Sequence, residues 1–167
     1  VIERDLVAEP LAPLDGEILG GFASSEDRSP RQQAAVTLSD QLIAEIEAAD
    51  SLVIGVPMYN FGIPTQLKSW FDYICRAGVS FKYTETGPVG LLRNKPVLLV
   101  MTTGGLHRDT STDLALAHVR TVLNFVGLND IQVAYAQGLG MGPEARESGL
   151  AAARDGVSNF LPSLTRP

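Results

Sequence analysis

Short apolar runs alternate with stretches of helical spacing along the whole chain. Continuous apolar runs are typical of parallel strands buried on both faces, and they predict strands at residues 1–6, 52–56, 97–101 and 131–135. Apolar residues three or four positions apart predict amphipathic helices, and this spacing recurs from Ser29-Pro30 onward and at residues 64–76, 113–125 and 143–160. The alternation predicts the α/β class, a doubly wound parallel sheet with helices on both faces.

The connections add a hairpin and a long loop. Residues 79–91 hold two short strand patterns around Glu85-Thr86-Gly87-Pro88, which predicts an inserted β-hairpin. Residues 10–30 are rich in Pro, Gly, Ser and Asp and predict a connection longer than compact domains usually tolerate without a functional reason. A length of 167 residues indicates one domain, residues 1–167.

The start of the chain predicts an incomplete sheet. A doubly wound sheet of the flavodoxin type has strand order 2-1-3-4-5 and binds its ligand beside strand one. Counting back from the later strands makes residues 1–6 strand two, so strand one, its phosphate loop and the first helix would precede Val1, which is not a methionine. We expect a gap one strand wide between residues 1–6 and 52–56. The alternative is a four-stranded sheet complete as it stands.

Composition excludes several classes of protein. Apolar residues make up 45% and charged residues 19%, as in soluble globular chains. A net charge of −6 and no cluster of Lys or Arg argue against nucleic acid as a partner. No apolar run approaches the roughly 18 residues of a membrane span. A single cysteine, Cys75, and the absence of a secretion signal favour a cytoplasmic protein without disulfides.

Two loops carry the candidate chemistry. In open α/β sheets, ligands bind outside the carboxyl ends of the strands. Residues 57–64 (PMYNFGIP) follow one predicted strand and offer aromatic rings, an amide and peptide N–H groups. Residues 102–107 (TTGGLH) follow the next strand and offer two hydroxyls, two glycines and an imidazole. A flat heteroaromatic ring with polar edges, such as a flavin, matches these groups; neither loop suggests a metal site.

The segment PMYNFGIPTQLKSWFDYICRAGVSFKYTETGPVGLL, followed by KPVLLVMTTGGLH, resembles the family of FMN-dependent NADH azoreductases and quinone reductases. The resemblance runs from about Asp5 to Pro143-Glu144. It implies a flavodoxin-like homodimer with two FMN sites at the subunit interface. It also implies ping-pong turnover, in which NADH or NADPH reduces the flavin and the flavin then reduces quinones or azo compounds.

The resemblance also implies roles for individual residues. Tyr83 and Phe125 would come from the partner subunit to cover the ring, and His107 would lie near its N1/O2 edge. With Asn60, these three form the expected catalytic set. The family's phosphate-binding serines belong to a loop with no counterpart among these residues, and Thr103 stands where some relatives carry arginine. The expected FMN-binding residues are Pro57, Met58, Tyr59, Asn60, Phe61, Thr102, Thr103, Gly104, Gly105 and His107.

Each of these residues could instead have a purely structural role. His107 could be a surface residue after a strand, and the aromatic residues of MYNF could be ordinary packing at a strand end. Cys75 and His118 are expected to be structural. The helix at residues 64–76 carries large apolar residues on more than one face, which predicts that Trp70 lies at a twofold dimer interface.

Three other functions remain open. A one-electron carrier would share the fold, but the net charge is modest and the hairpin suits a reductase. A hydrolase is disfavoured because the two histidines are far apart and no G-x-S-x-G motif is present. The third alternative is a non-catalytic or cofactor-free fragment of a flavodoxin-like electron-transfer protein.

Overall fold

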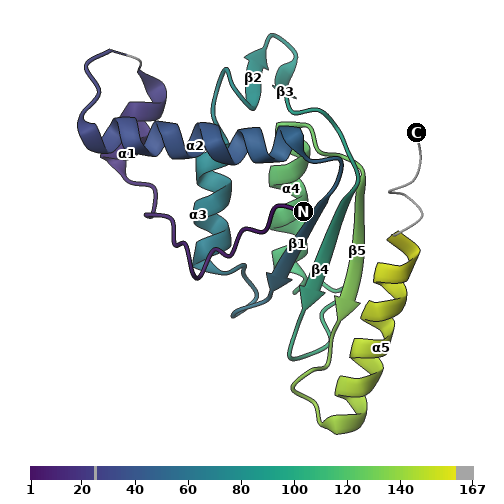
Figure 1. Ribbon diagram of the computed structural model, residues 1–167. Coiled ribbons are helices and arrows are strands. Elements are labelled where there is room, and N and C mark those ends of the chain that lie inside the picture. Colours follow the sequence, from purple (N-terminus) through teal and green to yellow (C-terminus); the bar gives the residue numbers. More distant parts are fainter. Residues whose placement is uncertain (25, 161–167) are drawn as a thin grey trace. The chain divides into compact units, whose positions relative to one another are not determined.

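The computed structural model describes residues 1–24 and 26–160 (Figure 1). These residues form two compact units. A helical unit comprises Val1–Ala49, Thr65–Arg93 and Phe125–Gly127. A sheet unit comprises Asp50–Pro64, Asn94–Asn124 and the described part of Leu128–Pro167. No helix in the described ranges is long and apolar enough to cross a membrane.

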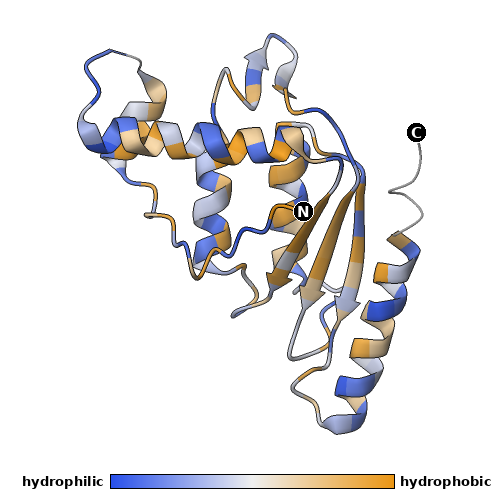
Figure 2. Cartoon of the chain, in the orientation of Figure 1, coloured by the Kyte–Doolittle hydropathy of each residue, from blue (hydrophilic) through white to orange (hydrophobic). Residues whose placement is uncertain are grey.

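The sheet unit contains three parallel strands in the order β1-β4-β5. They are β1 (Leu52–Pro57), β4 (Val97–Thr102) and β5 (Ile131–Ala136), each within one residue of its predicted range. Helix α5 (Pro143–Phe160) packs on β5 and β4, and its last residue, Phe160, is buried against Leu98 and Ala134. Figure 2 shows apolar residues running along β1 and β4. The α/β class and the parallel sheet are therefore confirmed.

Strand β1 departs from the expectation that it is covered on both faces. It lies at one edge of the described sheet, and the Val53 side chain is 66% exposed. Gly55, two residues on, is exposed on the same face. Helix α5 packs against β5 and β4, whereas β1 lies at the edge of the sheet, where Val53 and Gly55 stay exposed.

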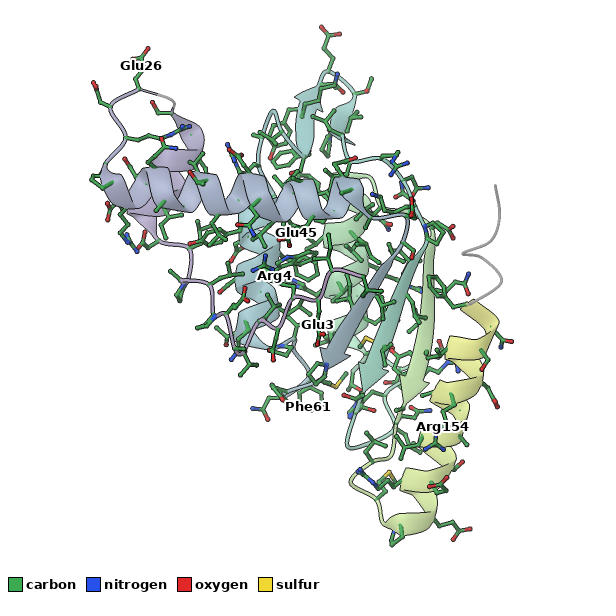
Figure 3. The ribbon with its side chains drawn as sticks, in the orientation of Figure 1. Glu3, Arg4, Glu26, Glu45, Phe61 and Arg154 are labelled. Carbon is green, nitrogen blue, oxygen red and sulfur yellow. The ribbon has the colours of Figure 1, made fainter. Side chains whose placement is uncertain are left out.

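The prediction of a strand at residues 1–6 is wrong. The backbone there is irregular and enters a turn, in which the Asp5 carboxylate accepts hydrogen bonds from the N–H groups of Val7 (2.8 Å) and Ala8 (3.2 Å). Arg4 is anchored by ion pairs with Glu9 (2.6 Å) and with Glu45 of the helix α2 (Pro30–Ala48; Figure 3). A strand needs a ladder partner, and no strand of the described residues pairs with residues 1–6.

The helical unit is built on α2 (Pro30–Ala48), which begins at the predicted cap. Ser29 accepts from the Gln32 N–H, and the Gln32 side chain accepts from the Ser29 N–H. Helix α1 (Gly16–Ala23) packs on α2 and lies in the segment that was expected to be a loop. Asp15 caps it by accepting from the Ile18 N–H (2.9 Å).

Two further elements complete the helical unit. Helix α3 (Thr65–Ile74) packs on α2 and buries Phe71, Tyr73 and Ile74. The predicted hairpin consists of β2 (Phe81–Thr84) and β3 (Gly87–Gly90), paired antiparallel. Helix α4 (Leu114–Val126) has its residues up to Asn124 in the sheet unit and its last two residues in the helical unit.

Candidate functional site

The chain makes a tight turn directly after β1. Met58 donates to the Thr102 carbonyl (2.8 Å), which extends the parallel ladder by one residue. Tyr59 and Gly62 then exchange two backbone hydrogen bonds of 2.9 and 3.0 Å. Between them Asn60 (φ +48°) and Phe61 (φ +68°) both have left-handed backbone, the pattern of a type I′ turn. Asparagine tolerates this conformation, but for a bulky side chain such as Phe61 it is strained.

This turn presents polar and aromatic groups outward. Tyr59 and Phe61 are 63% and 49% exposed, and Asn60 is also exposed. Phe61 lies beyond the carboxyl end of β1 (Figure 3). No hydrogen bond within the described residues uses the peptide N–H of Asn60 or Phe61. The turn therefore has both donors and ring surface available for a ligand.

The loop after β4 lies beside this turn, because β1 and β4 are paired strands. Thr103 is buried, and its polar groups are engaged: its N–H donates to the Ala136 carbonyl, its carbonyl accepts from Leu139, and its hydroxyl donates to the Gly105 carbonyl (2.8 Å). Gly104 is exposed and has open space where a side chain would project. The loop is thus held rigidly while its outer surface stays clear.

His107 is fixed by several contacts. Its N–H and that of Arg108 both donate to the Gln137 side-chain oxygen at 3.2 Å. Its ring nitrogen Nδ1 lies 2.8 Å from the Thr112 hydroxyl. The Phe61 ring meets the imidazole edge to face, with ring centres 5.7 Å apart. The structure therefore brings His107 to the turn that carries Phe61.

A second polar pair lies behind this loop. The Tyr135 hydroxyl donates to the Asp113 carboxylate, and the Arg108 guanidinium lies 5.7 Å from the Tyr135 ring centre. Burial, and then the Asp113 carboxylate, raise the pKa of Tyr135 above its ordinary range, so the phenol stays protonated. Tyr135 is buried, and its bond to Asp113 anchors the residues just before α4 to β5.

The two expected cover residues belong to the helical unit. Tyr83 on β2 is 74% exposed, and Phe125 is half-buried near the end of α4. Both contact Phe81, whose ring centre lies 5.5 Å from that of Tyr83 and 4.3 Å from that of Phe125. The sequence did not single out Phe81, which joins the two residues into one aromatic cluster.

The sheet-unit loops fit the polar edge of a flat heteroaromatic ring. They supply free peptide N–H donors, the Asn60 amide, the Phe61 ring and an uncrowded glycine at position 104. In residues 1–24 and 26–160 no three side chains of His, Cys, Asp or Glu come together to hold a metal ion. The donor set thus suits an organic cofactor that is recognised by hydrogen bonds and stacking.

Comparison with known proteins agrees with the fold and adds a family. Residues 1–161 match the model of the family described as having a flavodoxin-like fold. The azoreductase from Bacillus anthracis superposes with a TM-score of 0.85 at 27% identity, over 95% of this chain and 80% of that one. The architecture is therefore that of the flavodoxin-like proteins.

Relatives with higher sequence identity indicate which members of this family the chain resembles. Proteins named FMN-dependent NADH:quinone oxidoreductase are 59% identical in Tolumonas auensis and 48% identical in Shewanella loihica, each over 161 residues and 96% of this chain. The match covers 80% and 82% of those relatives. The chain belongs to the flavodoxin-like family that these oxidoreductases represent.

Proposed function

We propose that this protein is an FMN-dependent oxidoreductase that uses NADH or NADPH to reduce quinones and azo compounds. The observation that carries the proposal is the strained turn after β1, which keeps Asn60 and Phe61 exposed with unused peptide N–H groups beside the loop after β4. Backbone strain of this kind persists where function requires it. The names of the close relatives support the same activity.

FMN, when bound, supplies the redox chemistry by taking a hydride from the nicotinamide and passing two electrons to the acceptor. The turn would hold the ring through the Asn60 amide and the free peptide N–H groups. The adjoining Pro57, Met58, Tyr59 and Phe61 would shield the ring from water. From the other loop, Thr102, Gly104 and Gly105 would contact its polar edge.

Thr103 has a different part in this proposal. Its hydroxyl and both backbone groups are already hydrogen-bonded within the protein. We therefore assign it to shaping the loop, and its place in the expected FMN-binding set rests on position rather than on a free polar group. His107 would lie at the ring edge, where a positive donor stabilises the negative charge that develops on two-electron reduction.

Assembly and location complete the proposal. Tyr83 and Phe125 would cover the ring of a neighbouring subunit in a homodimer with two FMN sites. Their aromatic cluster around Phe81 supports this role, because Tyr83 is largely exposed and still oriented by a ring contact. A cytoplasmic location accords with a single cysteine, which can form no internal disulfide.

The first test is an anaerobic titration of the purified protein with FMN and then with NADH. A reductase accepts the hydride of NADH and takes up two electrons in one step, a one-electron carrier is reduced stepwise by dithionite but not by NADH, and a cofactor-free fragment fails to bind FMN at all. Asn60→Ala should raise the Kd for FMN about threefold to tenfold, the worth of one hydrogen bond. Asn159→Ala, at an exposed position on α5, is the matched control and should leave that Kd unchanged.

His107→Ala should act on the potential rather than on affinity. A charge-assisted hydrogen bond contributes about 1.5–3 kcal/mol, and a two-electron couple moves about 30 mV per 1.4 kcal/mol. The midpoint should therefore fall by tens of millivolts, and hydride transfer from NADH should slow more than FMN binding weakens. Equal midpoint potentials in the wild type and the variant would show that His107 does not interact with the flavin and is an ordinary surface residue after a strand.

A further inference from the structure

We propose that Thr112 and Thr110 hold His107 in the tautomer that carries its proton on Nδ1, which leaves Nε2 as the nitrogen that binds or releases a proton. The two threonines are then positioning residues. The inference about the tautomer comes from the hydrogen bonds of this loop. Its consequence for the cofactor rests on the proposed function.

Three contacts link the two hydroxyls to the histidine. The Thr110 hydroxyl donates to the His107 carbonyl at 2.7 Å. The Thr110 and Thr112 hydroxyl oxygens lie 2.8 Å apart. The Thr112 hydroxyl lies 2.8 Å from Nδ1 of His107. The two hydroxyls thus connect the His107 ring nitrogen Nδ1 to the backbone carbonyl of the same residue.

Counting protons along this chain leaves one arrangement. A hydroxyl has one proton, and a carbonyl can only accept, so the Thr110 proton is used on the His107 carbonyl. Thr112 must then donate to Thr110, because two oxygens 2.8 Å apart with no proton between them repel each other. The Thr112 proton is now used as well. Nδ1 of His107 must therefore supply the proton of the last contact.

Other neighbours keep the ring in this orientation. Gln137 holds the backbone at His107, and the Phe61 ring meets the imidazole at 86°. Nε2 lies 3.0 Å from the point where a Cβ would stand on Gly105, so any side chain at that position would press on the nitrogen. Gly105 belongs to the loop at the carboxyl end of β4, so Nε2 lies over the loop proposed to contact the ring edge.

The tautomer decides what His107 can do for a ligand. In the neutral imidazole Nε2 only accepts a hydrogen bond, because the single ring proton is held at Nδ1. Nε2 becomes a donor only when the ring is protonated, so a donated hydrogen bond and a positive charge arrive together. Such a group favours an anionic edge over a neutral one, which is the discrimination that reduction of a bound flavin requires.

The tautomer can be measured without cofactor or turnover. Long-range proton–nitrogen correlation spectra of the ¹⁵N-labelled protein distinguish protonated from unprotonated ring nitrogens, and the chain has only two histidines. His107→Asn identifies the signals. We expect neutral His107 to carry its proton on Nδ1, with Nε2 bare. A proton on Nε2 in the neutral ring would overturn the inference.

Variants test whether Thr112 sets this state. Thr112→Val removes the acceptor and should shift His107 to the other tautomer or to a mixture, whereas Thr112→Ser should retain the wild-type pattern. Thr121→Val is the matched control, because that exposed hydroxyl donates to the Ala117 carbonyl of its own helix. Unchanged His107 signals in Thr112→Val would refute a positioning role.

A kinetic arm separates this inference from the proposed function. In FMN-loaded protein, Thr112→Val should slow flavin reduction by NADH about threefold to tenfold, as expected for one lost hydrogen bond. Thr112→Ser should restore the rate, and the FMN Kd should stay within twofold in both. If the protein binds FMN and turns over while neutral His107 carries its proton on Nε2, the inference about the tautomer is refuted and the proposed function stands. If neutral His107 carries its proton on Nδ1 but the protein binds no FMN, the proposed function is refuted and the inference about the tautomer stands.

Discussion

The strained turn after β1 makes an unusual prediction about the order of two substitutions at position 61. Phe61→Ala and Phe61→Gly both remove the ring and its contact with His107, so these losses cancel in the comparison. They differ in the cost of φ +68°. A residue with a Cβ is disfavoured in left-handed backbone by about 1–2 kcal/mol, whereas glycine loses about 0.5–1 kcal/mol to the freedom of the unfolded chain. Glycine should therefore be the more stable variant by about 0.5–1 kcal/mol.

The neighbouring Tyr59 provides the matched pair. Tyr59 is also exposed and lies in the same turn, but its backbone is extended and pairs with Gly62. There the glycine variant should be the less stable by about 0.5–1 kcal/mol, since only the entropy difference remains. The order of alanine and glycine should thus reverse between two positions that are two residues apart.

The assay is chemical unfolding of the four variants without FMN, because a bound ligand would add its own stabilisation. The midpoints give the order, and a thermal scan should separate each pair by about 2–4 °C per kcal/mol for a chain of this size. If Phe61→Ala equals or exceeds Phe61→Gly in stability, the turn carries no strain. The same conclusion would follow if both positions showed the same order.

Three further predictions address other parts of the molecule. Trp70→Glu should convert the proposed dimer to a monomer in sedimentation experiments, and a variant that stays dimeric would move the interface elsewhere. Tyr135→Phe should lower the free energy of unfolding by about 1.5–3 kcal/mol in denaturant titrations, because the Asp113 carboxylate loses its phenol donor in a buried place; an unchanged midpoint would contradict this. Burial raises the pKa of Cys75 from 9.0 to about 11. At pH 8 the thiolate fraction is then about a hundredfold smaller, partly offset by the greater nucleophilicity of a more basic thiolate, so alkylation by iodoacetamide should be about tenfold slower than for an ordinary thiol and should increase up to about pH 11; rapid alkylation at pH 8 would show that the thiol is exposed.

The dimer prediction now depends on fewer residues than the sequence suggested. The surplus of apolar side chains on α3 was the reason to expect an interface. The structure buries Phe71, Tyr73 and Ile74, and Tyr73 makes an edge-to-face contact with Phe22 of α1. Trp70 is only partly buried and is what remains of the surplus. The sequence could not show this because α1, which supplies the contact, was itself missed.

The parts of the fold that were predicted correctly share a strong local signal. Helix α2 begins at the Ser29-Pro30 cap, and α5 has the bounds 143–160 that its spacing predicted. Helix α1 was missed because its sequence, GEILGGFA, contains three glycines, which are poor helix formers. Packing on α2 stabilises it despite that composition. Residues 1–6 failed for a different reason: the apolar opening is only Val1-Ile2 before Glu3, Arg4 and Asp5, so the strand prediction depended mainly on counting back from the later strands.

The site divides along a similar line. Topology alone places the loops after β1 and β4 at one edge of the sheet, so the MYNF and TTGGLH segments could be predicted to lie together. The residues that orient His107 could not. Gln137 follows β5, thirty positions after His107. Thr112 contacts the His107 ring only because the chain turns back between residues 107 and 112. The spacing of residues in the sequence predicts neither where a loop turns back nor which way a hydroxyl group points.

The distribution of backbone strain points to the same edge of the sheet. Among the described residues, left-handed backbone occurs at four positions other than glycine: Asp27, Asn60, Phe61 and Asp109. The last three lie in the loops that follow β1 and β4, and both loops contribute to the contact between Phe61 and His107. Asn60 and Asp109 tolerate this conformation, but at Phe61 the strain costs about 1–3 kcal/mol and persists only where the surroundings maintain it. A packing role would not require it, because a type I′ turn closes most easily with Asn-Gly. The chain instead has Asn-Phe, which keeps an aromatic ring at the position where the imidazole needs an edge contact and a flat ligand needs a surface.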